Sequence, residues 1–169
     1  MWGTARFCSL LLKLFCLPAD ATAAQVKAAR DAVDAFVKEY TDASEPYQAI
    51  AKIANLDKLT FLEAQVKAQQ IKAVESLKLK ASSKATKGAI TVKWTVKGDK
   101  AAADGYQVYK STKAQKGYKK AITTKKTSFK NTKNLKKGTR YFYKVRAYKV
   151  VDGKTYYSDW SNKANRYAK

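Results

Sequence analysis

The chain has 169 residues, of which 46% are hydrophobic, and a formal net charge of +22. This apolar content is sufficient for a buried core and excludes wholesale disorder. The absence of histidine removes the commonest general base and the commonest metal ligand. The charge is uneven, because residues 1–80 carry 11 Lys and Arg against 9 Asp and Glu, whereas residues 81–169 carry 24 against 4. This shift predicts a boundary between two differently built segments.

Residues 1–23 have the pattern of a secretory signal. A charged residue, Arg6, precedes an apolar run, and a small-x-small cleavage site follows at residues 21–23. The apolar run is too short to span a bilayer, so no transmembrane span is predicted. The two cysteines, Cys8 and Cys16, lie in this run, so the mature chain would have no disulfide and no thiolate metal site. We therefore predict a secreted or cell-surface protein. A misassigned start, or a chain cut from a longer protein, is the alternative.

Residues 24–75 are predicted to form two or three helices. Thr22 and Gln25 have the spacing of a capping box, and apolar residues then recur every three or four positions. Thr60 and Glu63 have the same spacing and predict the start of a later helix. The apolar stripes require cover, either from one another or from the following domain. A coiled-coil partner is a further alternative.

From residue 76 onward, helical periodicity gives way to alternation. Apolar and polar residues alternate at 90–95, 106–109 and 141–148, which is typical of half-buried strands. Glycine-containing turn signals separate these runs, and Asp152-Gly153 is typical of a two-residue hairpin turn. Short strands separated by turns at this density predict an all-β sandwich or barrel.

Several of these segments resemble the strands of a fibronectin type III domain. The segments ITVKWT at 90–95 and DGYQVYKS at 104–111 resemble its second and third strands, and YSDWSN at 157–162 resembles its last strand. The most specific match is LKKGTRYFYKVRAY at 135–148, where Tyr141 is placed as the corner tyrosine whose hydroxyl bonds back to the backbone. The lysine-rich style is similar to that of domains in secreted and surface proteins of Gram-positive anaerobes.

The resemblance covers about residues 76–169. It implies a seven-stranded, immunoglobulin-like β-sandwich preceded by a helical segment. The core residues that it implies are Trp94, Tyr106, Val108, Tyr141 and Val145.

The resemblance also implies a non-catalytic role in extracellular spacing, in presentation of neighbouring domains, or in adhesion. The basic part contains four carboxylates, Asp99, Asp104, Asp152 and Asp159. Three of them lie beside glycine at predicted turns, where a short polar side chain bonds its own backbone, and a local structural role is expected for Asp159. The sequence has no glycine-rich phosphate loop and no metal-ligand cluster. We predict no enzymatic activity, no cofactor and no metal.

The outward residues of the segment 140–148 interleave cations with aromatic rings, and two interpretations remain open. The first is that this face binds an anionic cell-wall polymer such as teichoic acid, or a polysaccharide, by ring stacking and charge. The second is that the lysines maintain solubility while the rings pair across strands. A spacer contacting another surface protein, and an accessory domain of a longer secreted enzyme, are further candidates. Specific nucleic-acid recognition is not predicted, and the oligomeric state does not follow from the sequence. The candidate binding residues are Tyr109, Tyr118, Arg140, Phe142, Lys144, Arg146 and Tyr148.

Overall fold

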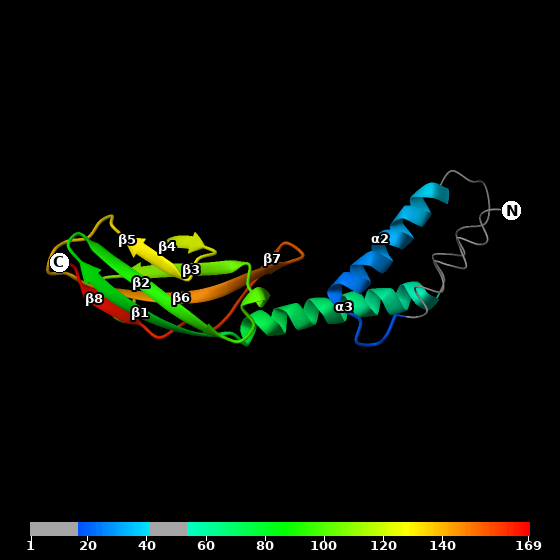
Figure 1. Ribbon diagram of the computed structural model, residues 1–169, viewed down its shortest axis with the longest axis horizontal. Helices are drawn as coiled ribbons and strands as arrows, with labels where there is room; N and C mark the ends of the chain where they lie inside the picture. Colours follow the sequence, from blue (N-terminus) through cyan, green and yellow to red (C-terminus); the bar gives the residue numbers. More distant parts are fainter. Residues whose placement is uncertain (1–16, 41–53) are drawn as a thin grey trace. The chain divides into compact units, whose positions relative to one another are not determined.

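The computed structural model describes residues 17–40 and 54–169 (Figure 1). The chain divides into two compact units, residues 1–69 and 70–169. Most of the predicted signal, with both cysteines, lies outside the described residues, as does any helix between residues 41 and 53. Within the described ranges, no helix combines the length and the apolar character needed to cross a membrane.

The first unit contains α2 (Ala23–Tyr40) and most of α3 (Ala54–Glu75). Thr22 caps α2 as predicted: its backbone amide donates to Gln25 Oε1 at 2.8 Å, and the Gln25 amide donates to Thr22 Oγ1 at 3.3 Å. These two bonds satisfy backbone donors that the first helical turn leaves free.

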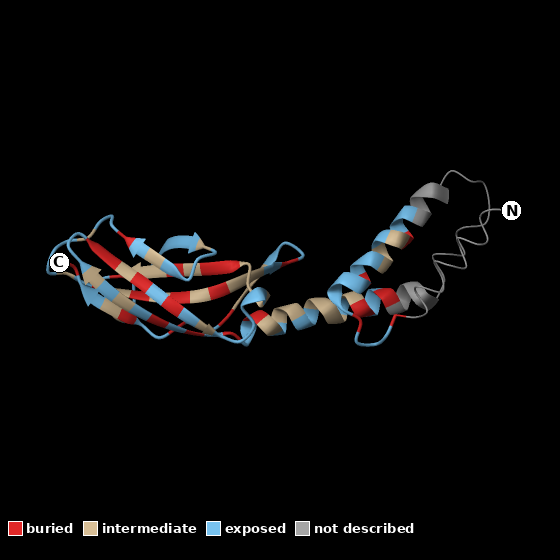
Figure 2. Cartoon of the chain, in the orientation of Figure 1, coloured by how far each residue is buried: buried red, intermediate tan, exposed pale blue. Residues whose placement is uncertain are grey.

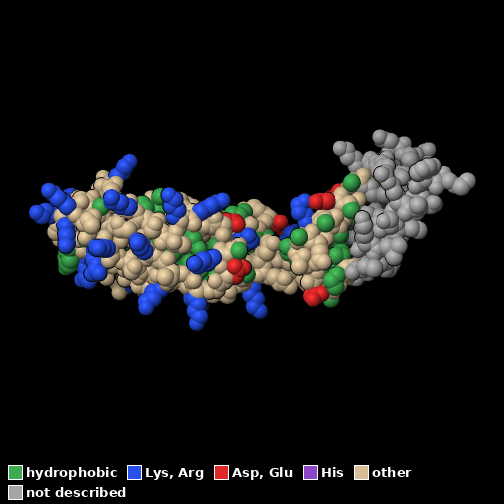
Figure 3. All heavy atoms as spheres, viewed as in Figure 1, with side chains coloured by type: hydrophobic (Ala, Val, Ile, Leu, Met, Phe, Trp, Pro, Cys, Tyr) green, Lys and Arg blue, Asp and Glu red, His purple; other side chains and the backbone are tan. Residues whose placement is uncertain are grey.

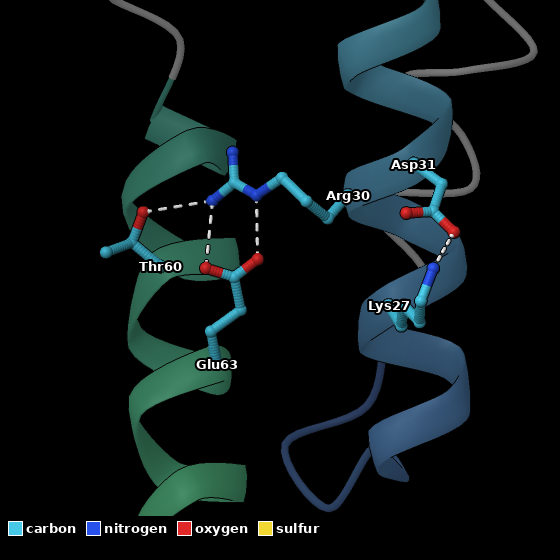
Figure 4. Close-up of polar contacts among 5 residues, drawn as sticks. All are labelled: Lys27, Arg30, Asp31, Thr60 and Glu63. Atoms are coloured by element: carbon cyan, nitrogen blue, oxygen red, sulfur yellow. Dashed lines mark hydrogen bonds and ion pairs between the residues drawn. The ribbon is translucent and has the colours of Figure 1, made fainter. Parts of the chain in front are cut away.

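The predicted helix start at Thr60 is wrong, because α3 begins at Ala54 and both Thr60 and Glu63 lie inside it. Side chains three residues apart also share one face of a helix, so the same spacing has a second meaning. Here both side chains meet Arg30 of α2 (Figure 4). Its Nε and Nη2 donate to the Glu63 carboxylate at 2.7 and 3.1 Å, and this contact raises the pKa of the Arg30 guanidinium.

The apolar stripes of α2 and α3 cover each other. Val26 and Val33 of α2 are buried with Leu59 and Leu62 of α3, and Leu17 and Ala21 complete the cluster. The sequence allowed three ways to cover the apolar stripes, and the structure shows that the two helices pack against each other. Phe61 points away from this cluster and is 61% exposed.

The second unit is an all-β sandwich of two antiparallel sheets. One sheet has the strand order β1-β2-β5, and the other has the order β4-β3-β6-β7 with β8 also paired to β6. The strands are β1 (Lys78–Thr86), β2 (Ala89–Lys97), β3 (Gly105–Ser111), β4 (Lys119–Thr124), β5 (Ser128–Asn131), β6 (Arg140–Val151), β7 (Lys154–Tyr157) and β8 (Ala164–Tyr167). A short 3-10 turn, η2 (Lys100–Ala102), precedes β3.

Burial alternates along the strands, as the sequence pattern predicts (Figure 2). The inward residues of both sheets form one core, and the rings of Trp94 on β2 and Tyr106 on β3 meet edge to face across it at 5.6 Å. Val74 near the end of α3, and Leu77, are also fully buried in this core. The residues Trp94, Tyr106, Val108, Tyr141 and Val145 are all buried.

The corner before β6 has the geometry that the resemblance implies. The Tyr141 hydroxyl accepts a hydrogen bond from the Lys136 amide at 2.9 Å and donates to the Asn134 carbonyl at 3.2 Å. At the other end of β6, Asp152 and Gly153 both have positive φ and form the two-residue turn to β7. That conformation is the one that matches the twist of a hairpin.

Within residues 70–169 the sandwich has eight strands and not the expected seven, because the last strand is divided into β7 and β8. Between β7 and β8, the hydroxyls of Ser158 and Ser161 take the place of backbone acceptors. Ser161 Oγ accepts from the Val145 amide at 3.0 Å, and Ser158 Oγ accepts from the Ala147 amide at 2.9 Å. The amides of the two serines donate back to the carbonyls of the same β6 residues. The segment 158–163 therefore follows β6 without regular strand geometry.

Candidate functional site

The outer face of the larger sheet is built by the alternation of β3 and β6. Because Tyr141, Val145 and the other inward residues fill the core, the residues between them point outward. The register pairs Gln107 with Arg146 and Tyr109 with Lys144. Trp160, carried by the segment between β7 and β8, adds an indole ring to this face.

Arg146 is held by hydrogen bonds and rings together. Its Nε and Nη2 donate to Gln107 Oε1 at 3.1 and 2.9 Å. Its guanidinium carbon lies 3.5 Å from the ring centre of Tyr157 and 4.6 Å from that of Trp160. A planar guanidinium can stack its face on a ring while its N–H groups donate hydrogen bonds in the plane, whereas an ammonium has no planar face to stack.

Lys144 occupies the next outward position and continues the stack. Its Nζ lies 3.9 Å from the ring centre of Trp160 and 4.7 Å from that of Tyr118. Burial lowers the pKa of Lys144, and the nearby charges of Arg146 and Lys163 act in the same direction.

These contacts form one continuous structure, which we call the cation-aromatic ladder. It runs from Tyr118 through Lys144, Trp160 and Arg146 to Tyr157, and Tyr109 meets Trp160 edge to face at 5.0 Å. Both of its cations are already surrounded by rings of the same chain.

The other candidate residues lie outside the ladder. Arg140 donates twice to Asn165 Oδ1 and lies 5.3 Å from the ring centre of Phe142 and 5.5 Å from that of Tyr167. The Tyr148 ring lies over Gly105, where an added Cβ would come within 3.0 Å of it. The structure therefore brings together four of the seven predicted residues, Tyr109, Tyr118, Lys144 and Arg146. Outside the ladder, Arg140 and Phe142 contact each other, and Tyr148 lies over Gly105.

A family model for the fibronectin type III domain matches residues 72–163, which is more than half of the chain. The chain belongs to the fibronectin type III family. Among solved structures, it is similar to an Fn3-like protein from Clostridium thermocellum, with 25% identity and a TM-score of 0.42 over 57% of this chain and 96% of that one.

Two larger proteins are similar over part of their length. They are a beta-1,2-glucanase from Parabacteroides distasonis, at 22% identity and a TM-score of 0.43, and the pectate lyase Pel3 from Pectobacterium carotovorum, at 18% identity and a TM-score of 0.43. The matches cover 56% and 52% of this chain but 14% and 26% of those proteins, so the chain spans a minor part of either. A search of curated proteins gave no significant match.

The contributors that sequence reasoning missed in this fibronectin type III domain are Trp160, Tyr157 and Gln107. Gln107 lies two residues before Tyr109 on β3, so the same alternation places it on the outer face and predicts it as a member of the site. Trp160 gave no periodic signal, because the serine contacts take the segment after β7 out of regular strand geometry. Tyr157 is the last residue of β7, and its neighbour Tyr156 is also aromatic, so the two residues show no apolar-polar alternation. The position of Trp160 beside β6 depends on those contacts, whereas Tyr157 is paired with Tyr148 of β6 in the regular strand register.

Three carboxylates of the domain make structural contacts, but of these only Asp99 bonds the backbone of its own turn as predicted. Asp104 and Asp159 instead bond residues 46 and 81 positions away along the chain. Asp99 caps η2 by accepting from the Ala101 amide at 2.9 Å. Asp104 accepts from the Val150 amide at 2.8 Å, and this bond, with help from Lys149, lowers the pKa of its carboxyl. Asp159 forms an exposed ion pair with Lys78 at 2.6 Å, which lowers the pKa of Asp159. In the described part of the chain, no three His, Cys, Asp or Glu side chains gather as a metal site.

Proposed function

We propose that this fibronectin type III chain is a non-catalytic, extracellular module that spaces or presents neighbouring partners. The observation that supports the proposal is the engagement of Arg146, which is held by Gln107, Tyr157 and Trp160 of the same domain. A surface whose cations are already stacked on its own rings has little to offer a ligand without first losing those contacts.

The ladder also has a mechanical consequence that suits a spacer. It connects β3, β6 and the segment between β7 and β8 through side chains, in addition to the backbone ladder. Each partly desolvated cation-ring contact stabilises by about 0.5–2 kcal/mol, and two charged groups share the ring of Trp160. A folded unit that resists local opening keeps its two ends at a constant separation.

The alternative, in which the ladder binds an anionic polymer or glycan, makes a different prediction. A binding face loses affinity when its cations are removed, beyond the loss that follows from the lower total charge. A structural ladder loses stability, and its retention on the polymer falls only as far as charge alone dictates.

The test compares two triple variants of the full chain that lose the same charge. One is Arg140→Ser, Lys144→Ser and Arg146→Ser. The control is Lys80→Ser, Lys84→Ser and Lys93→Ser, which changes three exposed lysines of the other sheet.

Retention of both variants on purified Gram-positive cell walls is measured across a salt series. The temperature is one at which circular dichroism shows that both variants are folded. We expect equal loss of retention from the two, and a lower urea midpoint for the first variant alone. Markedly weaker retention of a folded first variant would contradict the proposal. If the triple variant does not fold, the variants Arg140→Lys and Arg146→Lys replace it. They keep the charge but lose the guanidinium contacts, so the proposal expects unchanged retention and a lower urea midpoint.

A further inference from the structure

A groove of about 410 Å³ lies along the seam where β4, an edge of the larger sheet, approaches β5, an edge of the smaller one (Figure 1). Its lining residues come from β3, β4, β5 and the loop after β5. Five of them are lysines and none is a carboxylate; the lysines are Lys110, Lys119, Lys120, Lys130 and Lys133. The groove shares no residue with the cation-aromatic ladder.

Lys110 is the unusual member, because it occupies an inward position. It follows Tyr106 and Val108 in the inward alternation of β3, and it pairs with the fully buried Tyr143 on β6. Inward-pointing charges commonly protect edge strands, but β3 lies between β4 and β6 and has no free edge.

The surroundings of Lys110 leave its charge uncompensated. Its Nζ donates to the Lys133 carbonyl at 3.4 Å and lies 5.7 Å from the ring centre of Tyr141. Among the described residues, no carboxylate forms an ion pair with it or with the other four lysines of the groove. Burial lowers the pKa of Lys110, which reflects the cost of holding an ammonium there.

The wall formed by the loop after β5 is fixed by tyrosines of β6. Asn131 Nδ2 donates to the Tyr143 hydroxyl at 2.8 Å, and Asn131 Oδ1 accepts from the Lys133 amide at 3.3 Å. The corner hydroxyl of Tyr141 holds the next part of the loop at Asn134. The lysines are therefore presented on a preorganised frame, which reduces the entropy lost on binding.

We propose that this groove binds a linear polyol phosphate chain. Lysine binds phosphate as a compact point charge, without the planar bidentate geometry that arginine imposes on phosphates and carboxylates, and no arginine lines the groove. Such a lining suits phosphates that recur along a flexible chain. Its one aromatic residue, Phe129, packs against the core. The groove therefore has a single, half-buried ring, whereas single-stranded nucleic acids bind to a series of rings on which successive bases stack.

The charge of the whole domain supports an extended polyanion over a small anion. Lysine and arginine side chains are spread over the strands in Figure 3, and residues 81–169 contain only four carboxylates. This field draws a polyanion to the domain, and the groove then determines where the chain lies.

The test uses the full chain and a fluorescently labelled poly(glycerol phosphate), with affinity measured by anisotropy across a salt series. The groove variant is Lys119→Gln, Lys120→Gln and Lys133→Gln, and the matched control is Lys80→Gln, Lys84→Gln and Lys93→Gln. We expect the groove variant to lower the slope of log affinity against log salt by about 2, since roughly 0.7 counterion is released for each phosphate neutralised on a flexible chain. The control should change both the slope and the affinity far less. Equal losses in the two variants would overturn the proposal, because they would show diffuse attraction without a groove site.

Two further measurements test the position of Lys110 and the class of polymer. Lys110→Met removes the inward ammonium but keeps the length of the side chain, so it should weaken binding without lowering the melting temperature. Unchanged affinity for this variant would exclude the groove. Oligothymidylate and polyglutamate of matched charge should bind more weakly than the polyol phosphate, and equal or tighter binding of either would overturn the assignment of the polymer.

Discussion

Replacing Ser161 by alanine tests whether side-chain acceptors hold the last part of the domain to β6. In the structure the Ser161 hydroxyl accepts from the amide of Val145, a residue with no solvent exposure. Alanine removes one oxygen atom, so the cavity it creates is negligible and the effect comes from the hydrogen bond.

The expected cost follows from the amide that is left behind. A buried donor without an acceptor costs about 1–3 kcal/mol, which exceeds the net value of the bond itself. Ser158→Ala should have the same effect through the buried amide of Ala147. In a domain of this size, each kcal/mol lowers the melting temperature by about 4–8 °C.

Urea unfolding followed by tryptophan fluorescence measures the free energy, since Trp94 and Trp160 both report on the sandwich. Hydrogen exchange at the Val145 amide reports on the bond directly, and protection there should fall in Ser161→Ala. The control is Ser82→Ala, which alters an exposed hydroxyl on β1 and should change stability by no more than about 0.5 kcal/mol. An unchanged urea midpoint together with unchanged exchange at Val145 would refute the structural account of the divided strand.

Three other predictions concern the core, the corner and the acid response. Trp94→Ala should lower the free energy of unfolding by about 3–5 kcal/mol. Trp94→Phe should lower it clearly less, because the buried indole N–H has no hydrogen-bond partner among the described residues. The urea midpoints of the two variants test this difference. Tyr141→Phe removes the hydroxyl bonded to the Lys136 amide and should lower stability by about 1–2 kcal/mol in the same assay. Asp104 has its pKa lowered in the folded state by the Val150 amide, so its contribution is present above about pH 4 and is lost as the pH falls through the folded pKa. The difference in free energy of unfolding between wild type and Asp104→Asn should therefore shrink as the pH falls below about 4. A difference that stays constant in urea titrations across this pH range would contradict the prediction.

The sandwich could be predicted from sequence because its signals are local. Alternation along β2 and β6 places Trp94 and Val145 inward, and this depends only on the two-residue repeat of a strand. The turn at Asp152-Gly153 involves two adjacent residues, so the sequence already describes it. The corner at Tyr141 was implied by the resemblance of residues 135–148 to the family, and its bonds also stay within a few residues.

Local spacing misled at Thr60 and Glu63, where one pattern has two structural meanings. A threonine followed three residues later by a glutamate can begin a helix or can lie on one face inside it. Which meaning applies is decided by Arg30, a residue about 30 positions away that pairs with both side chains. No window around Thr60 contains that information.

The strands and inward residues of the domain could be predicted from the sequence, because they follow from periodicity and short turns. The family was indicated by the resemblance of several segments, residues 135–148 above all, to fibronectin type III strands. Only the tertiary structure decided what the outer cations do. Trp160 reaches Lys144 because serine hydroxyls replace strand acceptors, and Lys110 gathers with Lys119 and Lys133 because three strands converge at one seam. Such groupings depend on pairing between distant segments, and the position of a charge along the chain does not show whether it will meet a ring of its own domain or remain available to an anion.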